Sequence, residues 1–158
     1  MICAEIADLA AALPPMRTII GLDLGEKTIG VAVSDRLLSA ASPVETIRRK
    51  TFGLDATRLL AIAANRDTGG LILGLPRNMD GSEGPRCQST RAFARNLENL
   101  TDLPIGFWDE RLSTVAAERV LLEADASRKR RAEVIDTVAA AYILQGALDR
   151  LNHMKANP

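Results

Sequence analysis

An acidic residue interrupts the most strongly apolar hairpin of the chain. Residues 17–24 and 27–34 have the pattern of two strands joined by a turn that contains Gly25, and Asp23 lies inside the first strand. A carboxylate within an apolar strand costs desolvation free energy unless a partner compensates its charge. A metal ion, or a phosphate-bearing ligand held by one, supplies that compensation. The hairpin therefore indicates a sheet protein with phosphoester chemistry at Asp23.

Three further strands and several helices are predicted after the hairpin. The apolar patterns predict strands over 38–47, 71–75 and 104–109, and helices over 52–65, 86–100, 113–123 and 131–151. Gly69 and Gly70 are interpreted as a break before the fourth strand, and 125–130 as a basic connection. Strands joined by short turns pair antiparallel, whereas strands separated by helices pair parallel. The order predicts an α/β fold with a mixed five-stranded sheet, in which three antiparallel strands are followed by parallel ones.

One domain accounts for most of the 158 residues. Aliphatic residues from Ile2 to Leu13 recur at helical spacing, which predicts an N-terminal helical arm over 1–16. The main domain is expected over 17–151, and a C-terminal tail over 152–158. No apolar run approaches the roughly 18 residues of a membrane span, and the first residues do not have the pattern of a signal peptide. We therefore expect a cytoplasmic protein without membrane contact.

The rare residue types exclude several kinds of site. The single histidine, His153, is near the end of the chain, which disfavours a Ser-His-Asp hydrolase or a His-rich zinc site. Cys3 and Cys87 lack metal-binding spacing and are expected to be reduced. The formal net charge is zero, so only local clusters could bind a polyanion. The chemistry must rest on carboxylates, basic side chains, hydroxyls and backbone groups.

Three more acids lie in or beside ordered elements. Asp109 and Glu110 end the fifth predicted strand, and Asp136 lies early in the final helix among apolar residues. Oxygen ligands from separate elements, without a neighbouring His or Cys, fit Mg²⁺ or Mn²⁺ better than Zn²⁺. Such ions support the displacement of a phosphoryl group. Taken singly, each acid also fits a helix cap or an ion pair.

Basic residues cluster near the predicted acids. They follow the fourth predicted strand, follow the acidic pair and precede the final helix. The loops at the ends of parallel strands lie at one rim of the sheet, so these basic residues are expected near each other. Clustered Arg and Lys there would bind backbone phosphates. The residues concerned are Arg77, Arg111, Arg128, Lys129, Arg130 and Arg131. Phe107 and Trp108 offer a stacking surface for bases, or pack in the core.

Four ordered segments carry a family resemblance: Gly21-Leu22-Asp23-Leu24-Gly25, Gly74-Leu75-Pro76, Trp108-Asp109-Glu110-Arg111 and Val134-Ile135-Asp136. With them the chain resembles the YqgF/RuvX family of Holliday-junction-resolvase-like proteins, proposed to be pre-16S rRNA nucleases. The resemblance implies an RNase H-like fold in which Asp23, Glu110 and Asp136 are catalytic and hold Mg²⁺ or Mn²⁺. It also implies a cytoplasmic role in ribosome biogenesis. Thr137 stands where the family often has a lysine.

The leading hypothesis is a metal-dependent endonuclease that cleaves structured RNA at the 5′ end of pre-16S rRNA. Cleavage of branched DNA is the second hypothesis, and it would require a dimer. A non-catalytic nucleic-acid-binding or assembly module is the third. Asp23-x-Gly25-x-x-Thr28 also fits the phosphate hairpin of actin-like ATPases, but those proteins need two related domains and this chain has room for one. Monomer and homodimer both stay open.

Overall fold

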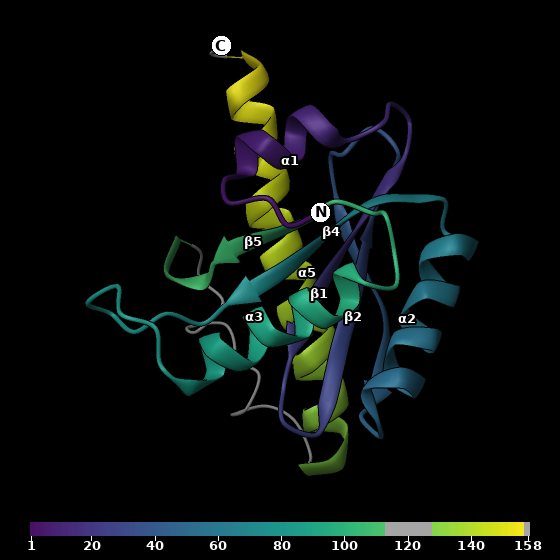
Figure 1. The fold of residues 1–158 in the computed structure, drawn as a ribbon, viewed down its shortest axis with the longest axis vertical. Helices are drawn as coiled ribbons and strands as arrows, with labels where there is room; N and C mark the ends of the chain where they lie inside the picture. Colours follow the sequence, from purple (N-terminus) through teal and green to yellow (C-terminus); the bar gives the residue numbers. More distant parts are fainter. Residues whose placement is uncertain (113–127, 157–158) are drawn as a thin grey trace.

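A mixed sheet forms the centre of the molecule (Figure 1). The computed structural model describes residues 1–112 and 128–156, with 128–136 by their backbone alone. The sheet has the order β3-β2-β1-β4-β5. Its strands are β1 (Thr18–Leu24), β2 (Thr28–Ser34), β3 (Ala41–Arg48), β4 (Thr68–Leu75) and β5 (Ile105–Asp109). The pairs β1–β2 and β2–β3 are antiparallel, whereas β1–β4 and β4–β5 are parallel, which confirms the predicted mixed sheet.

Helices cover both faces of the sheet. They are α1 (Ile6–Ala12), α2 (Phe52–Asn65), α3 (Pro85–Glu98) and α5 (Arg128–Ala156), with a short 3-10 turn η1 (Glu110–Leu112) after β5. In Figure 1, α2 and α3 lie on one face and α5 on the other. Each face has its own apolar core, one centred on α2 and α3 and the other on α5. No helix among the described residues is long and apolar enough to cross a membrane.

The middle of α5 packs directly on β1 at Gly21. A Cβ added to Gly21 would lie 2.6 Å from Leu144 Cβ and 3.1 Å from the carbonyl oxygen of Ala140. Only a glycine permits this approach, since real Cβ atoms do not come so close. Towards its C-terminal end, α5 donates a hydrogen bond from Asn152 to the carbonyl oxygen of Leu38, just beyond β2. Because β2 is antiparallel to β1, α5 also runs antiparallel to β1, with its early turns at the C-terminal end of that strand.

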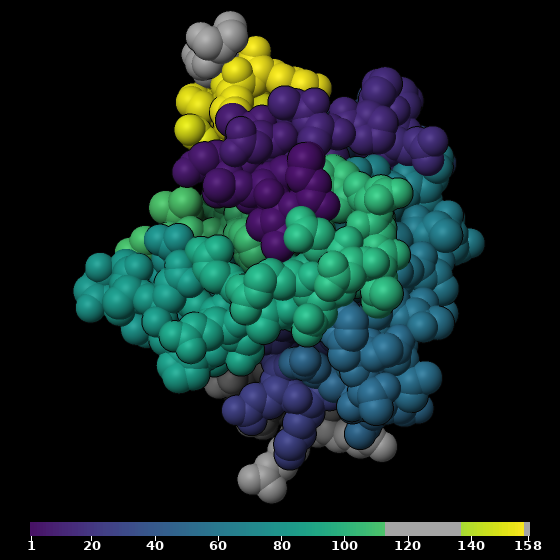
Figure 2. Space-filling model, viewed as in Figure 1, coloured from purple at the N-terminus to yellow at the C-terminus, as the bar shows by residue number. Residues whose placement is uncertain are grey.

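The N-terminal segment packs into the fold rather than beside it. Ile2 bridges Ile105 in parallel, so it is not helical as predicted, and the helix begins at Ile6. Leu9 is fully buried, and a Cβ on Gly106 would lie 3.0 Å from its Cδ2 atom. Figure 2 shows this segment, in purple, between α3 and the C-terminal end of α5. The division of the chain at residues 16 and 151 stays a prediction.

Gly69 and Gly70 belong to β4, so the prediction of a break at this pair was wrong. A Cβ on Gly70 would lie 2.6 Å from Leu13 Cδ2, and one on Gly69 would lie 2.7 Å from Arg17 Cβ. The two glycines therefore make room for the segment that precedes β1, while their backbone continues the strand. Glycine marks a close approach here, and not a turn.

The other helix and strand boundaries differ less from the predicted ones. Helix α5 begins at Arg128 and ends at Ala156, so the predicted basic connection is helical over 128–130, and the predicted tail is helical over 152–156. Arginine and lysine are good helix formers, so a basic run can open a helix. Pro43 lies in an edge strand beside a register shift, as expected for proline. The predicted helix over 113–123 and residues 157–158 lie outside the described residues.

Candidate functional site

Asp23 lies near the C-terminal end of the central strand, and its residue is only 4% exposed. Side chains alternate along a strand, so Asp23 points to the same face as Gly21, which is the face covered by α5. Across the sheet, Leu22 pairs with Leu73. The next residue on each strand, Asp23 and Gly74, therefore lie side by side. The pairing of β1 on both edges fixes the backbone that carries Asp23.

Glu110 reaches the same place from another element. It opens the η1 turn directly after β5, and its carboxyl carbon is 3.4 Å from the position of a Cβ on Gly74. That same position is only 2.4 Å from Ile143 Cδ1 of α5. The absence of a side chain at Gly74 thus lets both Glu110 and Ile143 of α5 approach the strand next to Asp23. The two predicted acids therefore both lie beside Gly74, at the same rim of the sheet.

Asp136, the third predicted acid, is described by its backbone alone. It lies in α5 one turn before Ala140, whose carbonyl oxygen packs against Gly21. Because α5 runs antiparallel to β1, residue 136 lies toward the end of β1 that carries Asp23. The backbone position is therefore compatible with a shared site, and the convergence of all three carboxylates stays a prediction.

The described part of this site offers oxygen donors for a hard cation. Asp23 and Glu110 supply carboxylates, and Gly74 lets Ile143 and Glu110 come close to the strand beside Asp23. His153 is at the far end of α5, and the buried thiols of Cys3 and Cys87 have pKa values raised by burial. Within residues 1–112 and 137–156, no three His, Cys, Asp or Glu side chains gather as a metal site. Carboxylate donors of this kind suit Mg²⁺ or Mn²⁺ better than Zn²⁺, and Asp136 as a third ligand stays a prediction.

The carboxylate of Asp109, the acid next to Glu110, forms an ion pair with Arg111. Arg111 donates to it from Nη2 to Oδ2 at 2.7 Å and from Nε to Oδ1 at 3.1 Å. These hydrogen bonds hold the pKa of Asp109 below its ordinary value. The Arg111 guanidinium also reaches the carbonyl oxygen of Met79, at 3.5 Å. Asp109 and Arg111 therefore tie the rim of the site to the loop after β4.

A second ion-pair network holds that loop, residues 76–84. Glu83 accepts two hydrogen bonds from Arg91, at 2.6 and 2.7 Å, and lies 3.3 Å from Arg77 Nη2. The Arg91 bonds, with the charge of Arg77, lower the pKa of Glu83. The Arg91 guanidinium lies 5.0 Å from the centre of the Phe107 ring. The predicted phosphate contacts Arg77 and Arg111 are thus both fixed by carboxylates.

The remaining predicted phosphate contacts occupy the first turn of α5. Arg128, Lys129, Arg130 and Arg131 are described by their backbone alone. Their turn belongs to the end of α5 that lies toward Asp23. A role in phosphate binding therefore stays a prediction for these four residues.

A hollow of about 800 Å³ follows the outer edge of β5. It starts beside Asp109, one residue from Glu110, and passes Phe107 and Trp108 toward α1 and α5. Sequence reasoning identified the aromatic pair but not this hollow, because its existence depends on β5 being the edge strand.

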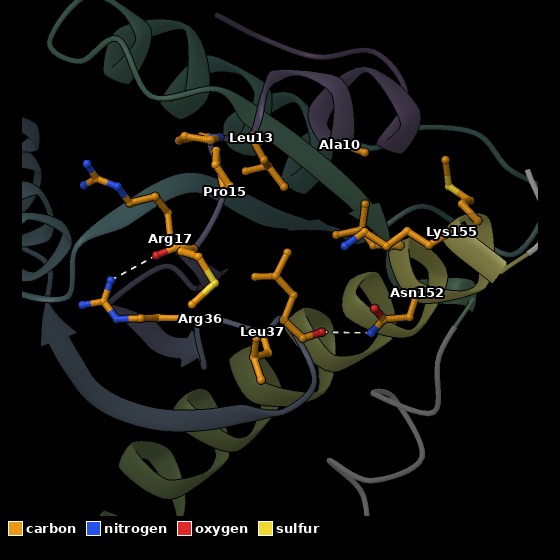
Figure 3. A pocket seen from close by; sticks show the side chains of 13 residues that line it. Ala10, Leu13, Pro15, Arg17, Arg36, Leu37, Asn152 and Lys155 are labelled. Carbon is orange, nitrogen blue, oxygen red and sulfur yellow. Dashed lines mark hydrogen bonds between the residues drawn. The ribbon is translucent and has the colours of Figure 1, made fainter.

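A second hollow, of about 560 Å³, lies at the opposite end of β1 (Figure 3). Its walls are mainly apolar and come from the segment before β1, the turn after β2 and the end of α5. Arg36 donates to the carbonyl oxygen of Met16, and Asn152 to that of Leu38. Met16 and Leu38 both have positive φ, near 60°. This hollow has no carboxylate in its lining, so it does not resemble the site at Asp23.

Comparison with known proteins gives the chain its family. A protein from Ruegeria sp. (strain TM1040), named "Putative pre-16S rRNA nuclease", is 73% identical over 99% of this chain and 100% of its own length. The same name belongs to a protein from Ruegeria pomeroyi that is 71% identical over 98% and 100% of the two chains.

Solved structures agree on the fold. Thermus thermophilus RuvC in complex with a Holliday junction substrate matches with a TM-score of 0.52 and 13% identity, over 85% of this chain and 96% of that one. The free Thermus thermophilus RuvC structure matches with a TM-score of 0.53. The protein thus has the RNase H-like fold of RuvC-type nucleases. A family model described as "RuvX: Holliday junction resolvase" matches residues 17–150. The predicted resemblance is confirmed, and the chain belongs to the RuvX family.

Proposed function

We propose that the protein is a metal-dependent endonuclease that hydrolyses phosphodiester bonds of structured RNA, at the 5′ end of pre-16S rRNA. One observation carries this proposal: Asp23 is buried beside Gly74, and the carboxyl carbon of Glu110 is 3.4 Å from the Cβ position of the same glycine. Two acids at the rim of a sheet suit a cation that a phosphate can approach. The name of the relatives supports RNA as the substrate.

The three acids have distinct supports in the fold. Asp23 is fixed by a strand that is paired on both edges, Glu110 by the turn after β5, and Asp136 by α5. Together they would hold Mg²⁺ or Mn²⁺. The chemistry supplied by such an ion is a more acidic water molecule and compensation of the charge on the phosphate. The buried position of Asp23 limits competition from bulk water.

The basic residues would align the substrate. Arg77 and Arg111 are each held by a carboxylate, so little conformational entropy is lost when they meet a phosphate. The first turn of α5, residues 128–131, would add further phosphate contacts. We place the protein in the cytoplasm, in ribosome biogenesis, as either a monomer or a homodimer.

Cleavage of a four-way DNA junction is the second candidate. The description of the matching family favours it, and the same acids would serve, since they act on the phosphate and not on the sugar. Two cuts at a junction require two sites, hence a dimer.

A side-by-side cleavage assay tests both candidates. The wild type is incubated with pre-16S RNA and with a four-way DNA junction, in Mg²⁺, Mn²⁺ or chelator. We expect RNA cleavage that chelator abolishes and that Asp23→Asn lowers at least 100-fold. Glu26→Gln is the matched control, because Glu26 is exposed in the turn after β1, and it should cleave as the wild type does.

Three results would contradict the RNA proposal. Full activity of Asp23→Asn would exclude the assigned site. Cleavage of the junction alone, by a dimer, would favour the DNA reading. Tight RNA binding with no cleavage in any metal would identify a non-catalytic binding module.

A further inference from the structure

The outer edge of β5 is only partly covered by the chain itself. Ile105 donates from its N–H to the carbonyl oxygen of Met1 at 2.8 Å, and its own carbonyl accepts from Cys3 at 2.7 Å. Backbone groups alternate in direction along a strand. The N–H and carbonyl of Phe107, two residues on, therefore point to the same outer side. Among the described residues, none outside the sheet makes a backbone hydrogen bond to Phe107.

The hollow beside this edge begins at residues that neighbour the acidic site in the chain. Its lining includes Leu75 and Asp109, which end β4 and β5, and Glu110 follows at once. From there it extends along Phe107 and Trp108 to Arg150 of α5. A volume of about 800 Å³ is in the range of small-molecule sites and is ample for one nucleotide. A strand whose phosphate lies at the acids would pass this hollow next.

The lining carries hydrogen-bond donors in excess. Over the described residues, the buried side-chain N and O atoms without a partner are Arg77 Nε and Trp108 Nε1. Both are donors, and both residues line this hollow. Trp108 is 8% exposed, with its ring edge against Gly146. Both atoms are buried, and Trp108 Nε1 is on the ring edge that faces Gly146, so a ligand in the hollow would reach these donors only after nearby side chains shift.

Aromatic and guanidinium groups stand together in the same lining. Arg91 lies over the Phe107 ring, and Arg91 and Arg77 share the carboxylate of Glu83. The lining itself has three arginines, Arg77, Arg91 and Arg150, and two acids, Glu5 and Asp109. Arg150 is exposed and has no ion pair within the described part of the chain. Unpaired bases are bound by stacking on aromatic rings and guanidinium planes, with nearby cations for the phosphates. A base pair within a duplex could not present its faces or edges in this way.

We propose that the hollow along β5 binds an unpaired nucleotide of the substrate strand, next to the phosphate held at Asp23 and Glu110. The open N–H and carbonyl of Phe107 form a donor–acceptor pair for a base edge, and Arg150 contacts the adjoining phosphate. The inference rests on the proposed nuclease function and adds a substrate class: RNA that is single-stranded on one side of the cleavage position.

Trp108 is the only tryptophan of the chain, so its fluorescence reports on this hollow directly. Asp23→Asn protein, in chelator, is titrated with a single-stranded RNA tetranucleotide, a blunt RNA duplex and an acidic decapeptide. We expect saturable quenching by the tetranucleotide and little by the duplex. Arg150→Ala, placed in the Asp23→Asn protein, should weaken tetranucleotide binding at least fivefold. Arg66 is an exposed arginine at the C-terminal end of α2, and the control substitution Arg66→Ala should leave tetranucleotide binding unchanged.

A cleavage comparison separates this inference from the proposed function. Wild-type protein receives two RNAs that differ only in whether the nucleotides beside the cleavage position are paired, and we expect the unpaired RNA to be cut at least tenfold faster. Equal cleavage of the two RNAs, or no quenching by the tetranucleotide, overturns the nucleotide site but does not contradict the proposed nuclease function. Quenching by the peptide alone overturns it in favour of a bound protein segment. Quenching by the tetranucleotide without any cleavage supports the nucleotide site and overturns the nuclease.

Discussion

Glu110 lies directly beside Gly74 at the rim of the sheet. The carboxyl carbon of Glu110 is 3.4 Å from the position that a Cβ on Gly74 would take, and Ile143 Cδ1 is 2.4 Å from the same position. Gly74 is therefore required for two reasons at once. It admits α5 to the sheet, and a larger side chain there would crowd the Glu110 carboxylate.

Gly74→Ala should reduce both stability and cleavage. The added methyl group must displace Ile143, which we expect to lower the free energy of unfolding by about 1–3 kcal/mol. Displacement of Glu110 should lower the cleavage rate at least tenfold, measured where the variant is still folded. Urea unfolding and single-turnover RNA cleavage are the two measurements.

Gly53→Ala is the matched control for this substitution. Gly53 lies in the first turn of α2, and a Cβ there has no atom within 4 Å. We expect unchanged cleavage and a gain of up to about 1 kcal/mol, because alanine has the higher helix propensity. A Gly74→Ala protein that is as stable and active as the wild type would contradict the assigned geometry.

Leu9→Ala should destabilise the whole domain. Leu9 is fully buried in the core under α5, close to Gly106, although it precedes the predicted main domain. Truncation of a buried leucine costs about 2–5 kcal/mol. Chemical denaturation measures the loss, and Leu54→Ala serves as the control because Leu54 is 58% exposed. A cost below 0.5 kcal/mol, which would be roughly that of a surface change, would mean that the arm is dispensable.

The carboxylate of Asp35 should stabilise the turn after β2 in a pH-dependent way. It accepts hydrogen bonds from Ser39 N at 2.7 Å, Ser39 Oγ at 2.6 Å and Ala40 N at 2.9 Å. The backbone bond from Ala40, followed by that from the Ser39 hydroxyl, lowers its pKa from 3.8 to about 2. Since the folded-state pKa is the lower one, the stabilisation is complete above pH 4 and disappears as the pH falls through about 2.

Asp35→Ala should therefore cost about 1 kcal/mol at pH 7, a modest value because the group is exposed to solvent. The difference from the wild type should shrink below pH 4. Thermal unfolding as a function of pH measures this difference, and Asp102→Ala, at another exposed aspartate, should show none. A constant difference across this pH range would rule out the carboxylate as the cause.

The first turn of α5 should contribute to the salt dependence of RNA binding. In the combined variant Arg128→Gln, Lys129→Gln, Arg130→Gln and Arg131→Gln, four proposed phosphate contacts are removed. Each contact contributes roughly 0.7–0.9 to the slope of log K against log salt, so we expect the slope to fall by about 3. Binding measured by anisotropy at several salt concentrations gives the slope. Arg66→Gln should not change it, and an unchanged slope in the combined variant would remove these residues from the interface.

The sheet and its two acids were predictable because strong local patterns specify them. Alternation and apolar runs located five strands, and the lengths of the connections predicted their directions. Asp23 was predicted as an acid in an apolar strand, and it is buried as expected. Glu110 was chosen over Asp109 on the family resemblance, and the engagement of Asp109 by Arg111 agrees with that choice.

Features set by contacts between distant segments were not predictable in this way. Gly69 and Gly70 have the composition of a break, yet they continue β4 because Leu13 and Arg17 pack against them. Ile2 fits a helical period, but its neighbours Met1 and Cys3 form backbone hydrogen bonds with Ile105 at the edge of β5. The hollow along β5 likewise depends on the strand order. Each of these results comes from tertiary contacts that override local preference.

The packing of α5 has a consequence for biosynthesis. This helix is the last element of the described fold, and it covers the sheet face that carries Ile19, Ala32, Ile72 and Asp23. During translation the strands emerge first, so the nascent chain exposes that apolar face until the helix is made. Asp136 emerges with the same helix. Under the proposed function, a ribosome-bound nascent chain would hold two of the three acids without a complete site, and would not yet cut the RNA of the ribosome that is synthesising it.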